Sequence, residues 1–346
     1  MTSTRHIHDT LDLLFQSLIV NSHDEFSFAG QTQTLEGLDP RELTALHQNA
    51  YQNSLVGLMQ KVLYEQAYTR HFQGIWHTPT KLSTDGVTEF MDSLSTSNTS
   101  RSFWDEGWKI QELSAAGDGV AVATKYGMTR QVLPGEYLSD EGLGTYPISG
   151  TPIRIFFPRE HPGLDGGFYF SFGESPAQPF SVKSVFRVYW NISAATSPLL
   201  LHNLTKMLNR FEVPFRFKCL NNPHLYAARI DNAILYVNRR FHRIALEIMY
   251  DLYNQFKDGV LPHTPLFSKA LAPGLGLAED PQNGESFGMS RCRIVAEGLW
   301  EAFQKKHDSL EAKKHLIKER FIHYGLSLDA PYLNPKSPYV YDFPIR

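Results

Sequence analysis

The chain of 346 residues carries 33 basic and 36 acidic side chains, and its formal net charge of −3 excludes proteins that coat nucleic acid or membranes by general electrostatic attraction. A hydrophobic share of 42% suffices for a sizeable core, in one large domain or two modest ones. Because it has only two cysteines, Cys219 and Cys292, and lacks the apolar pattern of a signal peptide or membrane span, we expect a cytoplasmic protein without a disulfide scaffold or thiolate zinc site.

The first hundred residues have a mainly helical pattern. Apolar side chains recur at helical spacing over residues 6–20. A longer helix is expected over residues 39–72, because Asp39 suits the N-cap and Pro40 the first turn. We therefore expect a helical N-terminal region over residues 1–100.

Short β segments separated by Gly, Pro and Asp begin after a polar stretch at residues 95–102, which we expect to be a linker. This pattern is typical of antiparallel pairing, so the fold class expected is α+β. Residues 101–346 are expected to form the catalytic domain, with a mixed or antiparallel sheet flanked by helices. The first strands are expected at residues 108–113, 119–127, 129–133, 152–158 and 167–174.

The clearest strand, residues 185–191, separates polar from apolar side chains. Arg187, Tyr189 and Asn191 fall on one face, so that face must meet solvent, a ligand or a partner. The elements expected after it are a helix at residues 196–211, strands at 214–220 and 232–237, and a helix at 241–256. The C-terminal third is expected to contain a Pro/Gly-rich loop at 261–288, a helix at 286–305 capped by Ser286, and a last helix ending near 323.

Basic side chains gather in the middle of the chain. Residues 183–243 hold ten Lys or Arg and two acids, a formal charge of +8 inside an otherwise acidic protein. Arg216 and Lys218 lie two apart on one strand, about 7 Å from each other, and like charges this close repel unless an anion lies between them. The same crowding favours a neutral Lys218 that accepts a proton.

Further cations extend this cluster into a candidate phosphate site. Arg187 shares the predicted face, Arg229 follows a likely turn, and Arg291 lies in the first turns of a helix, whose N–H groups suit an anion. Each strand arginine also fits an edge position or a surface ion pair, and Lys269 fits either a loop surface or a ligand contact. The remaining candidate substrate contacts are Asn191, Tyr236 and Ser286.

Other catalytic patterns are absent from the sequence. The run GLGLAED lacks the residues of a Walker A loop or a dinucleotide-binding fingerprint, and no GxSxG or HExxH pattern occurs. We expect the site to work with basic side chains alone, without a metal or an organic cofactor.

Three blocks in the basic and C-terminal regions carry a family resemblance. The runs RVYWN at 187–191, VPFRFKCLNNPHLYAARIDNAILYV at 213–237 and FSKALAPGLGLAEDPQNGESFGMSRCRIVAEGL at 267–299 resemble the Hop A type III secretion effector family. The likeness covers roughly residues 150–300. The resemblance implies that this chain has the architecture of the HopA effectors and the phosphothreonine lyases. It also implies elimination of phosphate from phosphorylated Ser or Thr, as in stand-alone members of lanthipeptide or thioamide peptide biosynthesis.

A looser resemblance to phosphothreonine lyases implies individual roles. Arg187-x-Tyr189, Arg216-x-Lys218 and Arg229 follow the order of a Lys-x-His pair, a Lys-x-Lys pair and an arginine in those enzymes. By position, Lys218 is the base and the arginines hold the phosphate. Tyr189 occupies the place of the acid histidine, and His224 is a candidate substitute for that acid.

The implied partners are a phosphorylated precursor peptide and a Ser/Thr kinase-like phosphotransferase. Two other functions use the same basic groove. A non-catalytic module would bind a phosphopeptide without converting it, and a type III effector would act on host signalling proteins. We favour the biosynthetic enzyme, because such effectors tend to begin with a long Ser-rich segment and this chain has a helical pattern near its start.

Overall fold

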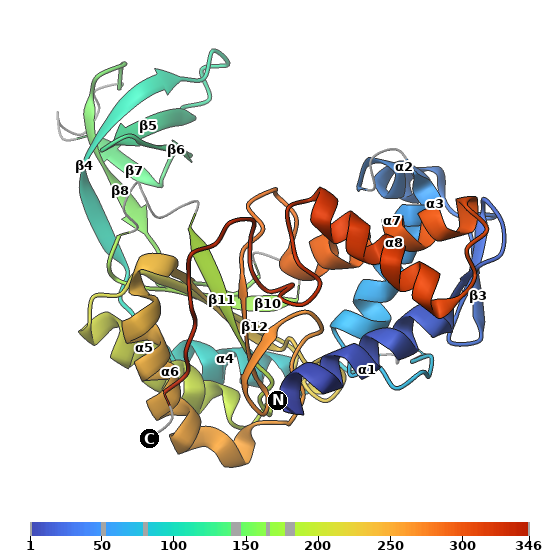
Figure 1. Cartoon of the computed structure of the whole chain (residues 1–346). Helices are drawn as coiled ribbons and strands as arrows, with labels where there is room; N and C mark the ends of the chain where they lie inside the picture. Colours follow the sequence, from blue (N-terminus) through green and yellow to red (C-terminus); the bar gives the residue numbers. More distant parts are fainter. Residues whose placement is uncertain are drawn as a thin grey trace.

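The computed structural model describes residues 2–49, 53–78, 82–139, 147–163, 167–176 and 184–344. A seven-stranded sheet forms the body, a helical lobe packs on one side of it, and a five-stranded sheet projects away from the lobe (Figure 1). The helices are α1 (Thr2–Ser17), α2 (Pro40–Asn49), α3 (Ser54–Leu63), α4 (Val87–Ser97), α5 (Ser197–Arg210), α6 (His242–Phe256), α7 (Phe287–Gln304) and α8 (Leu310–His323), with a π-helix η1 (Tyr64–Tyr68) and 3-10 turns η3 (Pro223–Leu225), η4 (Arg239–Phe241) and η5 (Lys257–Gly259).

Every described strand pair is antiparallel, so the expected α+β fold is confirmed. The body sheet has the order β14 (Lys269–Ala272), β15 (Leu275–Glu279), β11 (Val185–Trp190), β13 (Ala233–Asn238), β12 (Phe215–Leu220), β10 (Phe168–Phe172) and β9 (Glu160–His161). The projecting sheet has the order β6 (Met128–Val132), β5 (Ala121–Lys125), β4 (Phe103–Leu113), β8 (Pro152–Phe157) and β7 (Tyr137–Ser139). A small sheet joins β1 (Leu18–Val20), β2 (Glu25–Phe28) and β3 (Gln31–Thr34).

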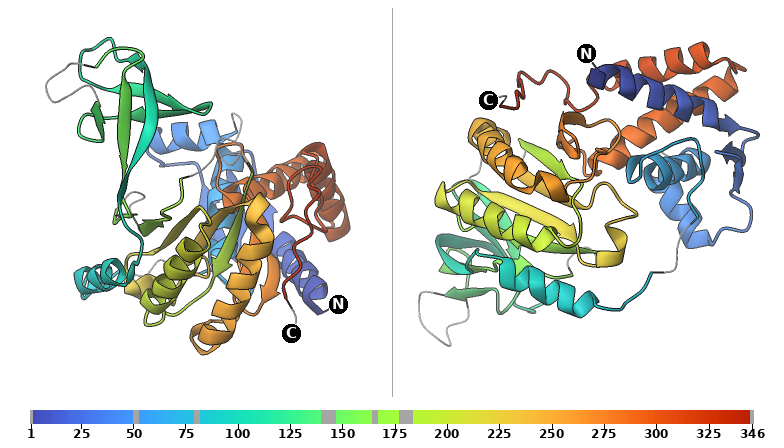
Figure 2. Two further views of the ribbon diagram at one scale, coloured as in Figure 1. Left: turned by 90° about the vertical axis from the view of Figure 1, so that its left-hand side faces the viewer. Right: turned by 90° about the horizontal axis from the view of Figure 1, so that it is seen from below.

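The two faces of the body sheet bury different cores. Helices α5 and α6 cover one face, where Phe186, Val188 and Trp190 of β11 are fully buried (Figure 2). The helical lobe covers part of the opposite face, where Tyr189 of β11 and Tyr236 of β13 join a second core. The polar face expected for residues 185–191 is therefore largely under helices rather than open to solvent.

The helical lobe combines both ends of the chain. Its core contains residues of α1 and α3 together with residues of α7 and α8. Gly298 of α7 allows close contact with α8, because a Cβ there would lie 2.7 Å from the Cα of Ile317. Residues 11–72 thus share a hydrophobic core with the C-terminal third, whereas Leu94 of α4 packs in the core under α5 and α6.

The helix expected over residues 39–72 is interrupted. The chain forms α2, then α3 and η1, and residues 50–52 lie outside the described residues. Asn53 caps α3 by accepting a hydrogen bond from the N–H of Val56. The segment expected as a helix at 6–20 ends at Ser17, because Leu18–Val20 pair with β2 instead.

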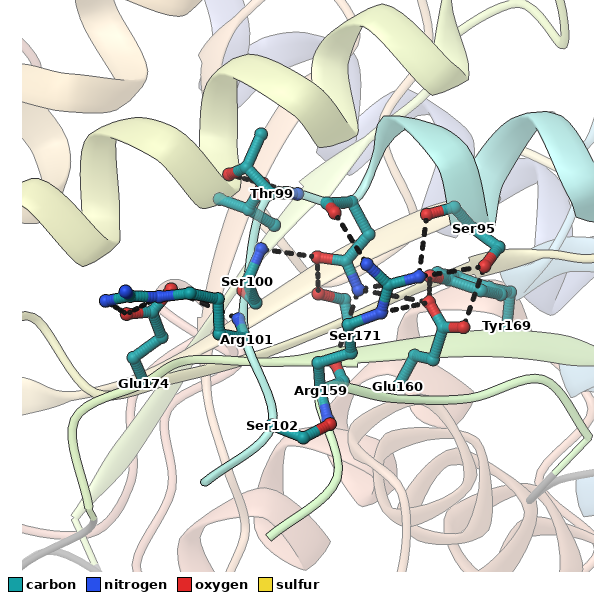
Figure 3. Close-up of polar contacts among 12 residues, drawn as sticks. Ser95, Thr99, Ser100, Arg101, Ser102, Arg159, Glu160, Tyr169, Ser171 and Glu174 are labelled. Atoms are coloured by element: carbon teal, nitrogen blue, oxygen red, sulfur yellow. Dashed lines mark hydrogen bonds and ion pairs between the residues drawn. The ribbon is translucent and has the colours of Figure 1, made fainter. Parts of the chain in front are cut away.

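The segment expected as a linker at 95–102 is packed into the body. Asn98 is 3% exposed and hydrogen-bonds Ser100, Tyr169 and Ser171, three of the residues labelled in Figure 3. Its amide donates to the hydroxyl of Tyr169, while its side-chain oxygen accepts from Ser171. Nearby, Arg101 pairs with Glu174, so the base of the projecting sheet is fixed by polar contacts on both sides of the segment.

The loop expected over residues 261–288 contains two strands, β14 and β15. Strand β15 is buried along its length and pairs with β11. Gly276 permits this packing, because a Cβ there would approach the hydroxyl oxygen of Ser268 to 2.8 Å. Tertiary pairing here overrides the weak strand propensity of a Gly-rich sequence.

Candidate functional site

Two predicted arginines lie in one row across three adjacent strands. Arg187 of β11 and Arg216 of β12 are both register partners of Tyr236 on β13, so all three side chains share a face. The guanidinium of Arg216 lies 4.3 Å from the centre of the Tyr236 ring, and that of Arg187 lies 5.1 Å from it. The shared cationic face expected from the sequence is therefore present.

The neighbouring row places Lys218 on the same face. Lys218 of β12 and Tyr189 of β11 are both register partners of Ile234. The Lys218 ammonium lies 3.9 Å from the centre of the Phe168 ring, and the Arg229 guanidinium lies 5.7 Å from the same centre. Two of the predicted cations, Lys218 and Arg229, therefore lie next to the same Phe168 ring.

A pocket of about 280 Å³ opens where these rows meet the helical lobe. Four residues predicted from the sequence, Arg187, Lys218, Tyr236 and Ser286, line it. A larger cavity of about 680 Å³ is lined chiefly by apolar side chains and by none of the predicted site residues. The charges of the smaller pocket make it the candidate site.

Two carboxylates balance part of the positive charge. Asp280 pairs with Arg187, and Asp231 accepts two hydrogen bonds of 2.9 Å from Arg229. Burial opposes the charge of Arg187, but the carboxylate of Asp280 beside it helps to hold its pKa above the ordinary value. Both arginines therefore stay charged.

A third carboxylate at the pocket, Glu285, is neutralised by Arg293 at 2.9 Å. Of the four predicted cations, Arg187 and Lys218 line the pocket, whereas Arg216 and Arg229 lie beside it on the sheet face and next to Phe168. Asp280 and Asp231 pair with Arg187 and Arg229. The surplus of basic groups over carboxylates around the pocket suits an anionic ligand such as a phosphate monoester.

The π-helix η1 supplies one wall of the pocket. Its Tyr64 and Tyr68 both line the cavity and stack with ring centres 5.2 Å apart. Burial, together with Asp231, raises the pKa of Tyr64, and burial raises the pKa of Tyr68. Both phenols therefore stay protonated near neutral pH. Short π-helices frequently occur at functional sites.

The start of α7 completes the wall. Ser286 caps this helix by accepting a hydrogen bond from the N–H of Met289, as expected from the sequence. Gly284, Glu285 and Ser286 line the pocket, so the positive end of the α7 dipole lies beside it. Backbone N–H groups at such an end are suited to anions.

Replacing Gly288 by alanine is expected to destabilise this wall. A Cβ at Gly288 would lie 2.4 Å from the buried Tyr68 ring, which has little room to move. Overpacking of this kind costs about 1–3 kcal/mol of unfolding free energy. Urea denaturation measures the change, and Gly163→Ala is the matched control, because a Cβ there meets nothing within 4 Å. Equal stability of the two variants would contradict the close approach of η1 and α7.

Tyr189 does not reach the pocket. It is fully buried behind Tyr68 and Phe287, and burial raises its pKa to about 12. Tyr189 therefore packs in the core between the sheet and the helical lobe, behind the pocket wall. His224, the other candidate acid, is exposed on η3 with its Nε2 3.0 Å from the carbonyl oxygen of Asp85, outside the pocket lining.

Three other predicted contacts lie away from the pocket. Lys269 is a register partner of Leu277, which pairs with Val188, so Lys269 points from the opposite face of the sheet. Its ammonium donates to the carbonyl of Tyr341. Arg291 is 1% exposed and donates to the carbonyls of Pro331 and Leu333, and burial lowers its pKa to about 10.

Asn191 is also structural rather than exposed to a ligand. Its amide donates to the carbonyl of His263 at 2.9 Å, and its side-chain oxygen accepts from Asn232 at 3.1 Å. The first contact is partly buried and the second is buried, and together they fix the end of β11 to the loop before β14 and the turn before β13. Asn191, Lys269 and Arg291 thus use their polar groups to hold backbone and side chains in place.

The site contains residues that sequence reasoning missed. Asp231 follows Arg229 by two positions, and Asp280 directly follows the unexpected strand β15. The Arg-x-Asp spacing at 229–231 was a usable signal for an ion pair. Tyr64 and Tyr68 gave only the spacing of a helix face, which is equally typical of a core.

The Arg187–Asp280 pair makes a stability prediction. Arg187→Met is expected to lower the unfolding free energy by about 2–3 kcal/mol, less than the cost for a fully buried pair, because the Asp280 side chain is 28% exposed. Adding Asp280→Asn should restore most of this loss. Urea denaturation of the single and double variants tests it, with Arg210→Met at an exposed site as the control. A double variant as unstable as the single one would contradict the ion-pair account.

The described residues contain no group of three or more His, Cys, Asp or Glu side chains that could hold a metal ion. None of the described helices is both long enough and apolar enough to span a membrane.

Comparison with known proteins identifies the family. The model of the HopA1 effector protein family matches residues 159–333, just over half of the chain, and the chain belongs to this family. The solved effector protein from Pseudomonas syringae pv. tomato strain DC3000 is 15% identical, with a TM-score of 0.46 over 86% of this chain and 97% of that one. The effector protein from Pseudomonas syringae pv. syringae strain 61 is 15% identical, with a TM-score of 0.45 over 86% and 100%. No curated protein sequence matches the chain.

Proposed function

We propose that this member of the HopA1 effector protein family is a phosphothreonine or phosphoserine lyase. One observation carries the proposal. Arg187, Arg216 and Lys218 share one face of the sheet, and Arg187 and Lys218 line the same pocket. A phosphate held by the arginines places the neighbouring Cα–H of the substrate near Lys218. Arg187, Arg216 and Arg229, against the carboxylates Asp231 and Asp280, support an anionic ligand.

The proposed reaction is a β-elimination. Lys218 removes the α-proton as the general base, the electron pair of the Cα–H bond forms the Cα=Cβ double bond, and the Cβ–O bond breaks to release phosphate. The peptide retains a dehydroalanine or dehydrobutyrine, and the Lys218 ammonium passes its proton to solvent. A positioned general base contributes about 10²–10⁴ in rate.

The cations stabilise charge where it develops. Arg187 and Arg216 neutralise the departing phosphate, and Arg229 stabilises the negative charge at the amide oxygen. Tyr64 and Tyr68, both protonated and both lining the pocket, are the proposed hydrogen-bond donors to the substrate. Preorganised donors of this kind are worth about 10²–10³ in rate each. In this scheme Tyr189 is not the acid.

The proposed substrate is a precursor peptide that a Ser/Thr kinase-like partner has phosphorylated, in ribosomal peptide biosynthesis of the lanthipeptide type. A phosphorylated segment of a signalling protein presents the same chemical group, so an effector role uses the same reaction. The non-catalytic phosphopeptide-binding module is the second candidate. The observation that favours it is the absence of Tyr189 and His224 from the pocket lining.

The experiment incubates the protein with a phosphothreonine peptide and follows intact mass. We expect loss of phosphoric acid and a product that a thiol traps. Loss of phosphate with recovery of threonine would mean a phosphatase and overturn the proposal. A peptide that binds and returns unchanged would establish the binding module, and the same peptide with unmodified threonine is the control.

A further inference from the structure

The segment at residues 331–341, called here the C-terminal strap, crosses the body close to the site. In Figure 1 this dark red segment runs from the helical lobe toward α6. Two side chains that the sequence assigned to phosphate hold it instead. Arg291 donates to the carbonyls of Pro331 and Leu333, and Lys269 donates to that of Tyr341.

A buried carboxylate is the centre of the strap's contacts. Glu279 is 0% exposed and accepts hydrogen bonds from the hydroxyl of Tyr341 at 2.8 Å and that of Ser337 at 2.6 Å. The other carboxylate oxygen of Glu279 accepts a hydrogen bond from the N–H of Asn334 at 2.8 Å. Arg239 forms an ion pair of 3.1 Å with the first oxygen, the one that Tyr341 and Ser337 contact. A carboxylate this buried is tolerated only when such partners compensate its charge.

The same contacts reach the pocket. Glu279 is followed directly by Asp280, the partner of Arg187, and residues 282 and 284–286 line the cavity. The side-chain amide of Asn334 donates to the carbonyl of Asp280 at 2.6 Å, and the N–H of Glu279 donates to the carbonyl of Tyr332. The strap therefore binds the backbone of Glu279 and Asp280, where the site loop, residues 280–286, begins.

We propose that the C-terminal strap positions the site loop through Glu279, and thereby sets the affinity of the pocket for a phosphorylated substrate. The functional part rests on the proposed lyase reaction, whereas the positioning itself does not. Glu279 and Tyr341 are positioning residues, because neither lines the pocket. Displacing the site loop moves Asp280 and the start of α7, so the cations lose the geometry that holds phosphate.

The test compares Tyr341→Phe with Tyr339→Phe. Tyr341→Phe removes the hydroxyl that donates to Glu279 and keeps the ring, whereas Tyr339 lies on the same strap and stacks on Tyr341. We expect Tyr341→Phe to speed hydrogen–deuterium exchange in residues 280–286. The KM for a phosphothreonine peptide should rise about tenfold while kcat changes less than about threefold. Tyr339→Phe should leave both readouts near wild type.

Unchanged exchange in the site loop of Tyr341→Phe would overturn the positioning role, whatever the enzyme activity. Faster exchange with an unchanged KM would overturn the link to affinity. If the wild-type protein eliminates no phosphate, the lyase proposal fails. In that case, the hydrogen–deuterium exchange of the site loop and the dissociation constant of the unconverted phosphopeptide, compared between Tyr341→Phe and the wild type, still test whether the strap positions the loop. Glu279→Gln is the second variant, expected to act in the same direction with a larger effect.

Discussion

Lys218→Arg is expected to reduce phosphate elimination by about 10³-fold or more while phosphopeptide affinity stays within about threefold of wild type. Arginine keeps the positive charge beside Phe168 but does not lose a proton near neutral pH, so it cannot serve as the base. The measurement is the single-turnover rate of alkene formation, together with the dissociation constant of the phosphopeptide.

Lys206→Arg is the matched control, because Lys206 is exposed on α5, which covers the opposite face of the sheet. Lys218→Ala should also lose elimination while binding persists. Turnover of Lys218→Arg near the wild-type rate would show that Lys218 contributes only charge, and the base would have to be sought elsewhere.

Arg216→Met is expected to lower the elimination rate by about 10²–10³-fold, the usual cost of removing one preorganised donor. Arg216 is exposed and rests on the Tyr236 ring, and it has no ion-pair partner among the described residues. Its loss should therefore change the unfolding free energy by less than about 0.5 kcal/mol. Stopped-flow phosphate release and urea denaturation measure the two effects separately.

Arg210→Met on the exposed end of α5 provides the matched control for charge removal. A strongly destabilised Arg216→Met variant would assign Arg216 to the fold. An unaffected rate would remove it from the phosphate clamp, leaving Arg187 and Arg229 as the candidate ligands.

The period of a β-strand explains what the sequence could predict of the site. Alternation placed Arg187 with Tyr189 and Arg216 with Lys218, and pairing of β11 and β12 with β13 brings both pairs to one face. Ser286 was predictable as an N-cap from its position before an apolar helical run. These predictions depend only on residues close together in the sequence, namely the alternation along a strand and the residues at the start of a helix.

Contacts between distant segments explain what the sequence could not predict. Lys269 and Arg291 satisfy carbonyls of the C-terminal strap, which lies far from them in sequence. Local patterns likewise do not reveal that η1 packs against α7, where Gly288 makes room for Tyr68. The boundary expected at residue 100 was drawn from composition, whereas the core of the helical lobe joins residues from both ends of the chain.

The central claim is that the bond broken lies between Cβ and oxygen, and oxygen isotopes test it most directly. The wild-type protein is incubated with a phosphothreonine peptide in water enriched in oxygen-18, and the released phosphate is analysed by mass. Elimination leaves all phosphate oxygens from the substrate, so we predict unlabelled phosphate and a dehydrobutyrine peptide. Phosphate that carries one oxygen from water, with threonine recovered, would contradict the account.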